Sequence, residues 1–108
     1  MAKNDLQGTL DLLVLKTLAQ MGALHGYGIV LHIQRASEEL LHVEEGSLYP
    51  ALHRMEQSGW IASQWSHTET NRKAKYYKLT PQGRHQLQRA EQSFEQLVKG
   101  VRTMLRHA

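Results

Sequence analysis

The sequence predicts a mainly α-helical fold with one small β-hairpin. Apolar residues recur at helical spacing in four segments, and the stretch between the third and the fourth alternates in the way of paired strands. The chain has 108 residues, of which 41% are hydrophobic and 21% are charged, so we expect one domain with a modest core. Because the sequence has no cysteine, disulfides and thiolate metal sites are excluded. No apolar run approaches the roughly 20 residues of a membrane helix, and we expect a cytoplasmic protein without a membrane partner.

The first helix is predicted from Leu6 onward, where apolar residues follow an i, i+3, i+4 pattern, and Gly22 is its expected end. Its apolar stripe consists of Leu6, Leu10, Leu13, Val14, Thr17, Leu18 and Met21. A second helix is predicted in "HGYGIVLHIQRAS", where Gly26 and Gly28 are poor helix formers and indicate close packing or a strained start. Its inward residues are Ile29, Val30 and Ile33. In the connection that follows, the apolar residues are expected to tuck under the domain: Leu40, Leu41 and Val43.

The third helix is predicted in "SLYPALHRMEQSG", with Ser47 as N-cap and Gly59 as the left-handed residue after its end. In that register Pro50 is the third helical residue, where a missing amide costs little because it has no acceptor within the helix. At 100° per residue, the residues on the core side are Leu48, Leu52 and Met55. The opposite face then carries Ser47, Pro50, His53, Arg54 and Gln57, which can meet base edges and phosphates.

A basic hairpin is predicted next. "WIASQWS" alternates and "KYYKLT" is rich in aromatic residues, which is typical of two strands joined by the polar stretch "HTETNRKA". The basic residues of this hairpin are Arg72, Lys73, Lys75 and Lys78. Residues 46–108 carry ten Lys or Arg against four Asp or Glu, whereas residues 1–45 carry three against six. This imbalance predicts a polyanionic partner for the basic part, although ordinary surface charge is the alternative.

A long last helix is predicted to begin at Thr80 and Pro81, a favoured pair at a helix start. Its apolar residues form a heptad seam, and the helix as a whole spans about 40 Å at ~1.5 Å per residue, too long for the rest of the chain to cover. We therefore expect a homodimer, with intramolecular packing on the first helix as the alternative. The expected interface consists of Leu6, Leu10, Leu87, Phe94, Leu97, Val98, Val101, Met104 and Leu105.

The order of helix, helix, helix, strand, strand, helix is that of a winged helix-turn-helix with a C-terminal helix added. We expect residues 1–80 to form the DNA-binding part and residues 81–108 the dimerisation helix, packed with the first helix as one compact unit. A two-fold dimer would place two recognition helices about 34 Å apart and so match a palindromic operator in double-stranded DNA.

The chain resembles the PadR family of bacterial transcriptional regulators, in the short form with one C-terminal helix. The motifs that carry the resemblance are "GTLDLLVLKTL", "HGYGI", "VEEGSLYPALHRMEQSGWI" and "RKAKYYKLTPQGR". The resemblance implies a dimeric repressor that binds an inverted repeat and releases it when a small molecule binds. It also implies a recognition helix from Ser47 to Gln57, a wing from Asn71 to Lys75, and a backbone contact at Tyr27.

The residues expected at the DNA are thus Tyr27, Ser47, Tyr49, Pro50, His53, Arg54, Gln57, Asn71, Arg72, Lys73 and Lys75. For Tyr49, packing at the helix boundary is an equal alternative to a phosphate contact. A small aromatic effector is a further hypothesis, with Phe94 as its one aromatic contact on the last helix.

Other function classes find less support in the sequence. Its seven histidines are scattered, no HExxH or GxSxG pattern is present, and we expect no enzyme, no metal and no cofactor. The main alternative is a winged-helix module that binds protein without specific DNA binding. The basic hairpin argues against it, since a protein-binding module has no need of that cluster of cations.

Overall fold

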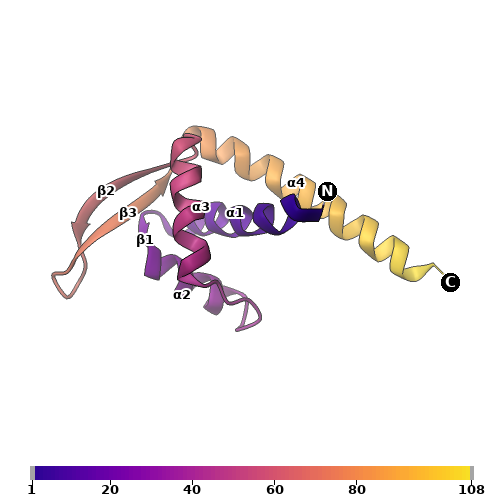
Figure 1. Cartoon of the computed structure of the whole chain (residues 1–108), viewed down its shortest axis with the longest axis horizontal. Helices are drawn as coiled ribbons and strands as arrows, with labels where there is room; N and C mark the ends of the chain where they lie inside the picture. The colour runs from indigo at the N-terminus through magenta and orange to yellow at the C-terminus, as the bar shows by residue number, and fades with distance from the viewer. Residues whose placement is uncertain (1, 108) are drawn as a thin grey trace.

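The structure is a computed structural model that describes residues 2–107, with the helical backbone alone for residues 2–7. It confirms a mainly helical fold with a small antiparallel sheet and a long C-terminal helix (Figure 1). The elements in chain order are α1 (Ala2–Met21), β1 (Leu24–His25), α2 (Gly26–Ala36), α3 (Glu45–Gln57), β2 (Ile61–His67), β3 (Lys73–Leu79) and α4 (Pro81–Arg106).

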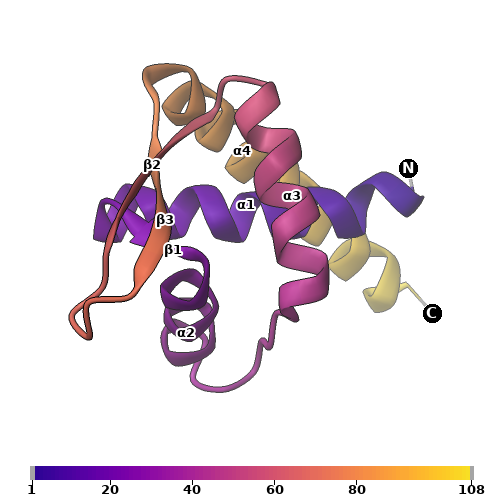
Figure 2. The ribbon, with the colours of Figure 1, turned by 60° about the vertical axis from the view of Figure 1, so that its left-hand side comes forward.

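Helix α1 forms the centre of the domain. It packs against α2, α3, α4 and β3, and α3 crosses in front of it (Figures 1 and 2). Because α1 is covered from several sides, Leu15 is fully buried although it lies outside the predicted stripe. The predicted end of this helix is confirmed, since α1 stops at Met21 and Gly22 follows with a left-handed φ of 78°. Met21 itself is 52% exposed. The buried apolar core consists of Val14, Leu15, Leu18, Ile29, Ile33, Leu48, Ala51, Leu52, Met55, Ile61, Tyr77 and Leu87.

Helix α3 begins earlier than the sequence predicts. Its N-cap is Glu44, whose carbonyl oxygen accepts the backbone N–H groups of Ser47 and Leu48. Ser47 is therefore inside the helix and is not its cap, and Pro50 lies within the helix, where it removes the hydrogen bond to the Gly46 carbonyl. The predicted core side of the helix is confirmed, because all three of its residues are fully buried.

The end of α3 matches the prediction. Gly59 has a φ of 82°, and its N–H donates to the Glu56 carbonyl while the Trp60 N–H donates to the Met55 carbonyl. This pair of bonds is a Schellman motif, which satisfies carbonyl groups in the last turn. The chain then enters the sheet with Ile61 buried and Trp60 packed against the core.

The sheet has three strands in the order β1-β3-β2, all antiparallel. The β2–β3 hairpin is the predicted one, and its strands project from the body as the wing (Figure 1). Strand β1 was not predicted, because two residues are too few to show an alternating pattern. It adds to the edge of β3, where Leu24 lies opposite Tyr77 and His25 opposite Tyr76.

The connection between α2 and α3 does not tuck under the domain as predicted. Leu40 is 83% exposed and Leu41 is 41% exposed, while Val43 packs against the core. Glu38 and Glu39 adopt left-handed φ values of 54° and 69°, so the chain turns sharply after α2 and carries both leucines outward.

Helix α4 begins as predicted, with Pro81 as its first residue and Thr80 as N-cap. The Thr80 hydroxyl accepts the Gly83 N–H at 3.0 Å. The first part of α4 packs on α1, and the second part extends away from the body toward the C-terminus (Figure 1). Residues 99–107 are all exposed. None of the described helices is both long and apolar enough to cross a membrane.

Candidate nucleic-acid interface

The outer face of α3 is open to solvent. Five of the six residues predicted to contact DNA from this helix are exposed in the structure: Ser47, Tyr49, Pro50, His53 and Gln57. The sixth, Arg54, is half-buried. The wing stands beside this helix, with α2 below it (Figure 2). A polar helix face and a basic hairpin thus border the same side of the domain.

A groove of about 820 Å³ lies between the first turns of α2 and α3 and the wing. It brings together five residues that the sequence predicts at the DNA, namely Tyr27, Tyr49, Arg72, Lys73 and Lys75. Its other lining residues are His25, Gly26, Glu45, Trp65, Thr68, Thr70, Ala74 and Tyr77. The wing lines the groove with basic residues, aromatic side chains line it from α2, α3 and the sheet, and Glu45 places one carboxylate at the start of α3.

The tip of the wing is a defined turn. The Asn71 N–H donates to the Thr68 carbonyl at 2.8 Å, and the Thr68 N–H donates to the Arg72 carbonyl at 2.8 Å. The Thr68 hydroxyl also accepts the Arg72 N–H at 3.2 Å. Asn71 has a left-handed φ of 62°, which asparagine tolerates better than most residues. These bonds fix the backbone from which Asn71 and Arg72 project.

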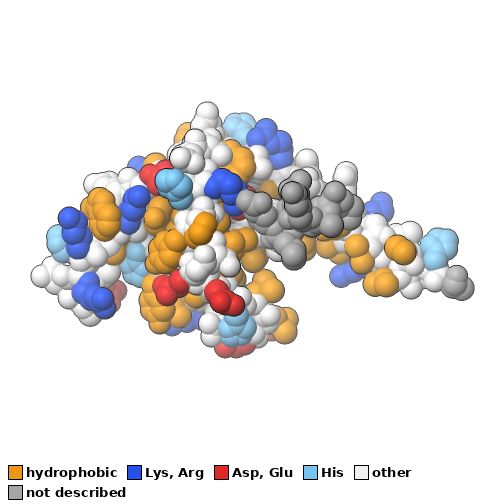
Figure 3. Space-filling view, in the orientation of Figure 1, with side chains coloured by type: hydrophobic (Ala, Val, Ile, Leu, Met, Phe, Trp, Pro, Cys, Tyr) orange, Lys and Arg blue, Asp and Glu red, His pale blue; other side chains and the backbone are white. Residues whose placement is uncertain are grey.

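Two wing lysines lie over aromatic rings. The Lys73 ammonium is 5.3 Å from the centre of the Trp65 ring, and Lys75 is 5.8 Å from the centre of the Tyr77 ring. Lys75 also pairs with Glu56 of α3 at 3.6 Å, so it links the wing to the helix. Lys and Arg side chains lie over the wing on the left of Figure 3. Of these two lysines, Lys73 is the more exposed.

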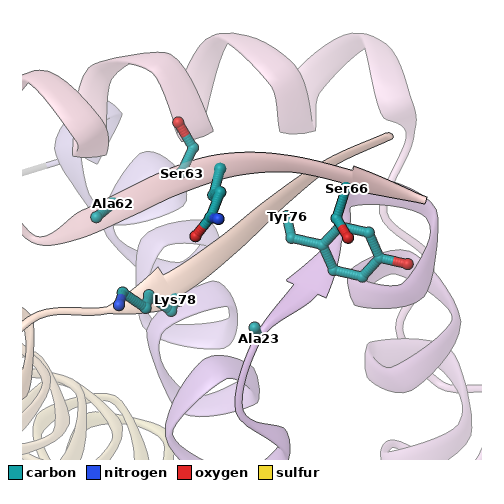
Figure 4. A pocket seen from close by; sticks show the side chains of 7 residues that line it. Ala23, Ala62, Ser63, Ser66, Tyr76 and Lys78 are labelled. Carbon is teal, nitrogen blue, oxygen red and sulfur yellow. The ribbon is translucent and has the colours of Figure 1, made fainter. Parts of the chain in front are cut away.

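The remaining basic residue of the hairpin, Lys78, lies on the other side of the sheet. Side chains alternate across a strand, so the residues at 76 and 78 face away from those at 73, 75 and 77. Lys78 and Tyr76 line a separate hollow of about 510 Å³, together with Ala23, Ala62, Ser63, Gln64 and Ser66 (Figure 4). Lys78 therefore does not contribute to the groove.

Tyr49 packs at the helix boundary and also lines the groove. A phosphate contact by Tyr49 stays a prediction. Its ring lies over Gly26 of α2, where a Cβ atom would be 2.6 Å from the Tyr49 hydroxyl. This confirms that Gly26 is needed for close packing. Burial raises the pKa of the Tyr49 phenol above its ordinary value, and the nearby Glu45 carboxylate raises that pKa further.

His25 was not predicted to have a role, and it is the N-cap of α2. Its Nδ1 accepts the Gly28 N–H at 3.0 Å, and its ring meets Tyr76 edge to face at 5.2 Å. These contacts fix the start of α2, from which Tyr27 projects with 57% of its surface exposed. A histidine three residues before the second glycine, Gly28, carried no recognisable capping signal in the sequence.

Arg54 does not point into the groove. Its guanidinium donates two hydrogen bonds of 2.8 Å to the two carboxylate oxygens of Asp11 on α1. The pKa of Arg54 is raised, chiefly by these hydrogen bonds. Asp11 was missed at the sequence level, because one carboxylate within an apolar helix gives no indication of its partner 43 residues away.

The residues expected at a dimer interface fall into three groups. Leu87 is buried in the core of its own chain, and Leu10, Leu97 and Val98 are half-buried. The Leu6 side chain lies outside the described side chains. The exposed members are Phe94, Val101, Met104 and Leu105, with exposures of 40%, 46%, 76% and 77%. In the part of the chain that the structure describes, the second half of α4 thus presents an exposed apolar strip.

Phe94 borders two hollows. One, of about 240 Å³, lies between α1 and α4 and includes Asp11 and Leu97. The other, of about 390 Å³, runs along α4 beside Val98. Within the described part of the chain, no three His, Asp or Glu side chains come together as a metal site.

Comparison with known proteins identifies the family. The family model described as "Transcriptional regulator PadR-like family" matches residues 14–89 of the chain. Transcriptional regulator Rv3488 of Mycobacterium tuberculosis is 34% identical over 68 residues. This segment spans 63% of the present chain and 63% of that relative, which is less than two thirds of its length.

Solved structures agree in fold over nearly the whole chain. A transcriptional regulator from Clostridium thermocellum is 28% identical, with a TM-score of 0.81 over 95% of this chain and 96% of that one. A PadR family regulator from Eggerthella lenta DSM 2243 is 30% identical, with a TM-score of 0.77 over 97% of this chain and 89% of that one. These matches confirm the winged helix-turn-helix fold and the DNA-binding class that it implies. The chain belongs to the PadR-like family, which is a family of transcriptional regulators and not of enzymes.

Proposed function

We propose that this regulator acts as a homodimeric repressor that binds an inverted-repeat operator in double-stranded DNA. The observation that carries the proposal is the groove in which the start of α2, the start of α3 and the basic wing meet. Helix α3 enters the major groove, and the wing follows the flanking backbone.

The exposed face of α3 supplies the base contacts. An α-helix with its side chains is about 10–12 Å across, close to the ~12 Å width of the major groove. Ser47, His53 and Gln57 offer hydroxyl, imidazole and amide groups that can bond base edges, and Pro50 offers an apolar surface for a thymine methyl group. Arg54 was expected in this set, but its guanidinium is bonded to Asp11 of α1.

Phosphate contacts come from the wing and from Tyr27. Free N–H groups at a helix start usually favour an anion, but the Glu45 carboxylate in the first turn of α3 repels one. Among the described residues, neither Arg72 nor Lys73 forms an ion pair with a carboxylate, and Asn71 projects from the same turn. Lys75 adds a third charge, partly neutralised by Glu56.

The apolar strip on α4 forms the dimer interface. Phe94, Val101, Met104 and Leu105 are too exposed for a stable monomer surface, and they continue the heptad seam of the helix. We propose that they pack against the same helix of a second copy, with residues of α1 at the edge. A two-fold axis then sets two copies of α3 about one DNA turn apart, ~34 Å.

Release of the operator follows the binding of a small molecule near the dimer interface. The hollow between α1 and α4 borders Phe94, which can stack on a flat aromatic effector. Displacement of α4 there would change the distance between the two recognition helices.

Selection from a randomised duplex library tests this function. We expect the purified protein to enrich an inverted repeat whose half-sites are centred 10 to 11 base pairs apart, about one helical turn. Sedimentation of the complex should give two protein chains per duplex. Enrichment of a single unpaired half-site would contradict the dimeric mode, and no enrichment over random DNA from a folded dimer would favour a protein-binding module.

A further inference from the structure

A bidentate ion pair joins the recognition helix to the central helix. The two guanidinium nitrogens Nη1 and Nη2 of Arg54 meet the two carboxylate oxygens of Asp11 at 2.8 Å each. The Asp11 side chain is only 12% exposed and that of Arg54 is 36% exposed. Paired parallel bonds of this type fix both the distance and the relative orientation of the two groups.

This geometry differs from that expected of a residue that reads bases. The groove beside the wing is not lined by Arg54. Its charge is balanced at close range by a carboxylate, so it adds little to the positive potential of the DNA-facing surface. An arginine that reads guanine needs its guanidinium fork for the base, whereas here the two ends of that fork are bonded to α1.

We propose that Asp11 is a positioning residue for DNA recognition, which holds Arg54 and thereby fixes α3 relative to α1. The inference rests on the proposed function, since it explains how the operator contacts of α3 are oriented. Helix α1 also packs on α4, so the ion pair connects the recognition helix to the element that carries the apolar strip. The spacing of the two recognition helices in a dimer then depends on a residue that does not touch DNA.

Removing one partner of the Asp11–Arg54 ion pair should weaken operator binding more than removing both partners. Without Arg54, the Asp11 carboxylate is left nearly buried and uncompensated, which strongly disfavours the native arrangement. Neutralising Asp11 in the same chain removes that cost. If Arg54 instead read a base, the double variant would bind no better than the Arg54 variant, because removing Asp11 could not restore a lost base contact.

The experiment compares Asp11→Asn, Arg54→Gln, Arg54→Lys and the double variant Asp11→Asn with Arg54→Gln. Each is measured by fluorescence anisotropy on the selected operator and on a shuffled duplex, at a temperature where circular dichroism shows full folding. Lys16→Ala is the matched control, since it removes an exposed ion pair of 3.7 Å between α1 and Glu91 of α4. Asparagine at position 11 keeps the size of the side chain, so this variant is expected to fold.

We expect each single variant to bind the operator roughly tenfold more weakly, the size of a coupling within one hydrogen-bond network. Arg54→Lys should behave like Arg54→Gln, because a lysine keeps the charge but cannot make the paired bonds. The double variant should bind at least as well as either single variant. The salt slope of Asp11→Asn should equal that of the wild type, since no phosphate contact is lost.

Two results would overturn the proposal. The first is an Asp11→Asn variant that binds the operator with the same affinity and preference as the wild type, which would mean that Arg54 acts in DNA recognition without Asp11. The other is a double variant as weak as the two single losses combined. A wild-type protein that does not distinguish the operator from the shuffled duplex would instead contradict the proposed function itself.

Discussion

The first turn of α4 lies directly on the backbone of Trp60: a Cβ atom at Gly83 would be 2.0 Å from the Trp60 carbonyl oxygen. Thr80 closes the same junction, since its N–H donates to the Trp60 carbonyl and its hydroxyl donates to the Gly59 carbonyl at 2.6 Å. These contacts join the end of α3, the end of the sheet and the start of α4. The direction in which α4 leaves the domain is therefore set by backbone packing.

Gly83→Ala should destabilise the protein, because the added methyl group meets a backbone carbonyl that cannot rotate away. We expect a loss of about 2 to 3 kcal/mol in the free energy of unfolding, the upper part of the usual range for overpacking. Urea unfolding followed by circular dichroism measures it. The matched control is Gly100→Ala on the same helix, where nothing lies within 4 Å and the change should stabilise. Equal stability of the two variants would contradict the close junction.

Pro50→Ala should stabilise α3, since the structure places Pro50 inside the helix and not in its first turn. Restoring the N–H that bonds the Gly46 carbonyl should raise the free energy of unfolding by about 1 to 3 kcal/mol. Chemical unfolding of the two proteins gives the difference. An unchanged stability would mean that the helix begins near Ser47, where a proline costs little. The same variant should bind the operator less well if Pro50 meets a thymine methyl group.

Stability at high pH should depend on two tyrosines. Burial raises the pKa of Tyr49 and of Tyr77 above the ordinary 10.0, with further contributions from Glu45 and Glu56 respectively. A raised pKa in the folded state means that the stabilisation is fully present below pH 10 and is lost as the pH rises through the folded-state values. We expect the free energy of unfolding to fall above pH 10, less steeply in Tyr49→Phe. Identical slopes for wild type and variant would argue against the shift at Tyr49.

Val101→Asp should dissociate the dimer, because it places a carboxylate in the apolar strip of α4. We expect the dimer dissociation constant to rise by roughly tenfold or more, as for a buried unpaired charge at an interface. Sedimentation equilibrium at several concentrations measures it. Thr103→Asp adds the same charge on the opposite side of the helix and serves as control. If both variants remain equally dimeric, the interface lies elsewhere on the chain.

Patterns within one helix were predictable from the sequence. The core side of α3, the left-handed Gly59 and the Thr80 cap each depend on residues within one or two turns, and all three predictions are confirmed. The start of α3 was misplaced by three residues because Glu44 caps it through its backbone and not its side chain. Local sequence does not encode such a cap strongly.

Contacts between distant segments were not predictable from one sequence. The pairing of Asp11 with Arg54 and the close approach of Gly83 to Trp60 depend on how helices meet in space. The short strand β1 forms only because β3 offers a free edge beside it. The exposed Leu40 shows the reverse error, in which an apolar residue was assigned to the core on composition alone.

A salt series tests most directly whether the groove between α3 and the wing binds operator DNA. Affinity for the duplex upstream of the protein's own gene would be measured by fluorescence anisotropy for wild type, for Arg72→Ala with Lys73→Ala, and for Lys78→Ala. Each phosphate contact contributes about 0.9 to the steepness of log affinity against log salt. The wing variant loses two contacts in each of the two chains of the dimer, so its plot should be less steep by roughly 3 to 4. Lys78→Ala should leave the slope unchanged, because Lys78 lies on the other face of the sheet. A slope that falls as much for Lys78→Ala as for the wing variant, or binding that does not depend on salt, would contradict the claim.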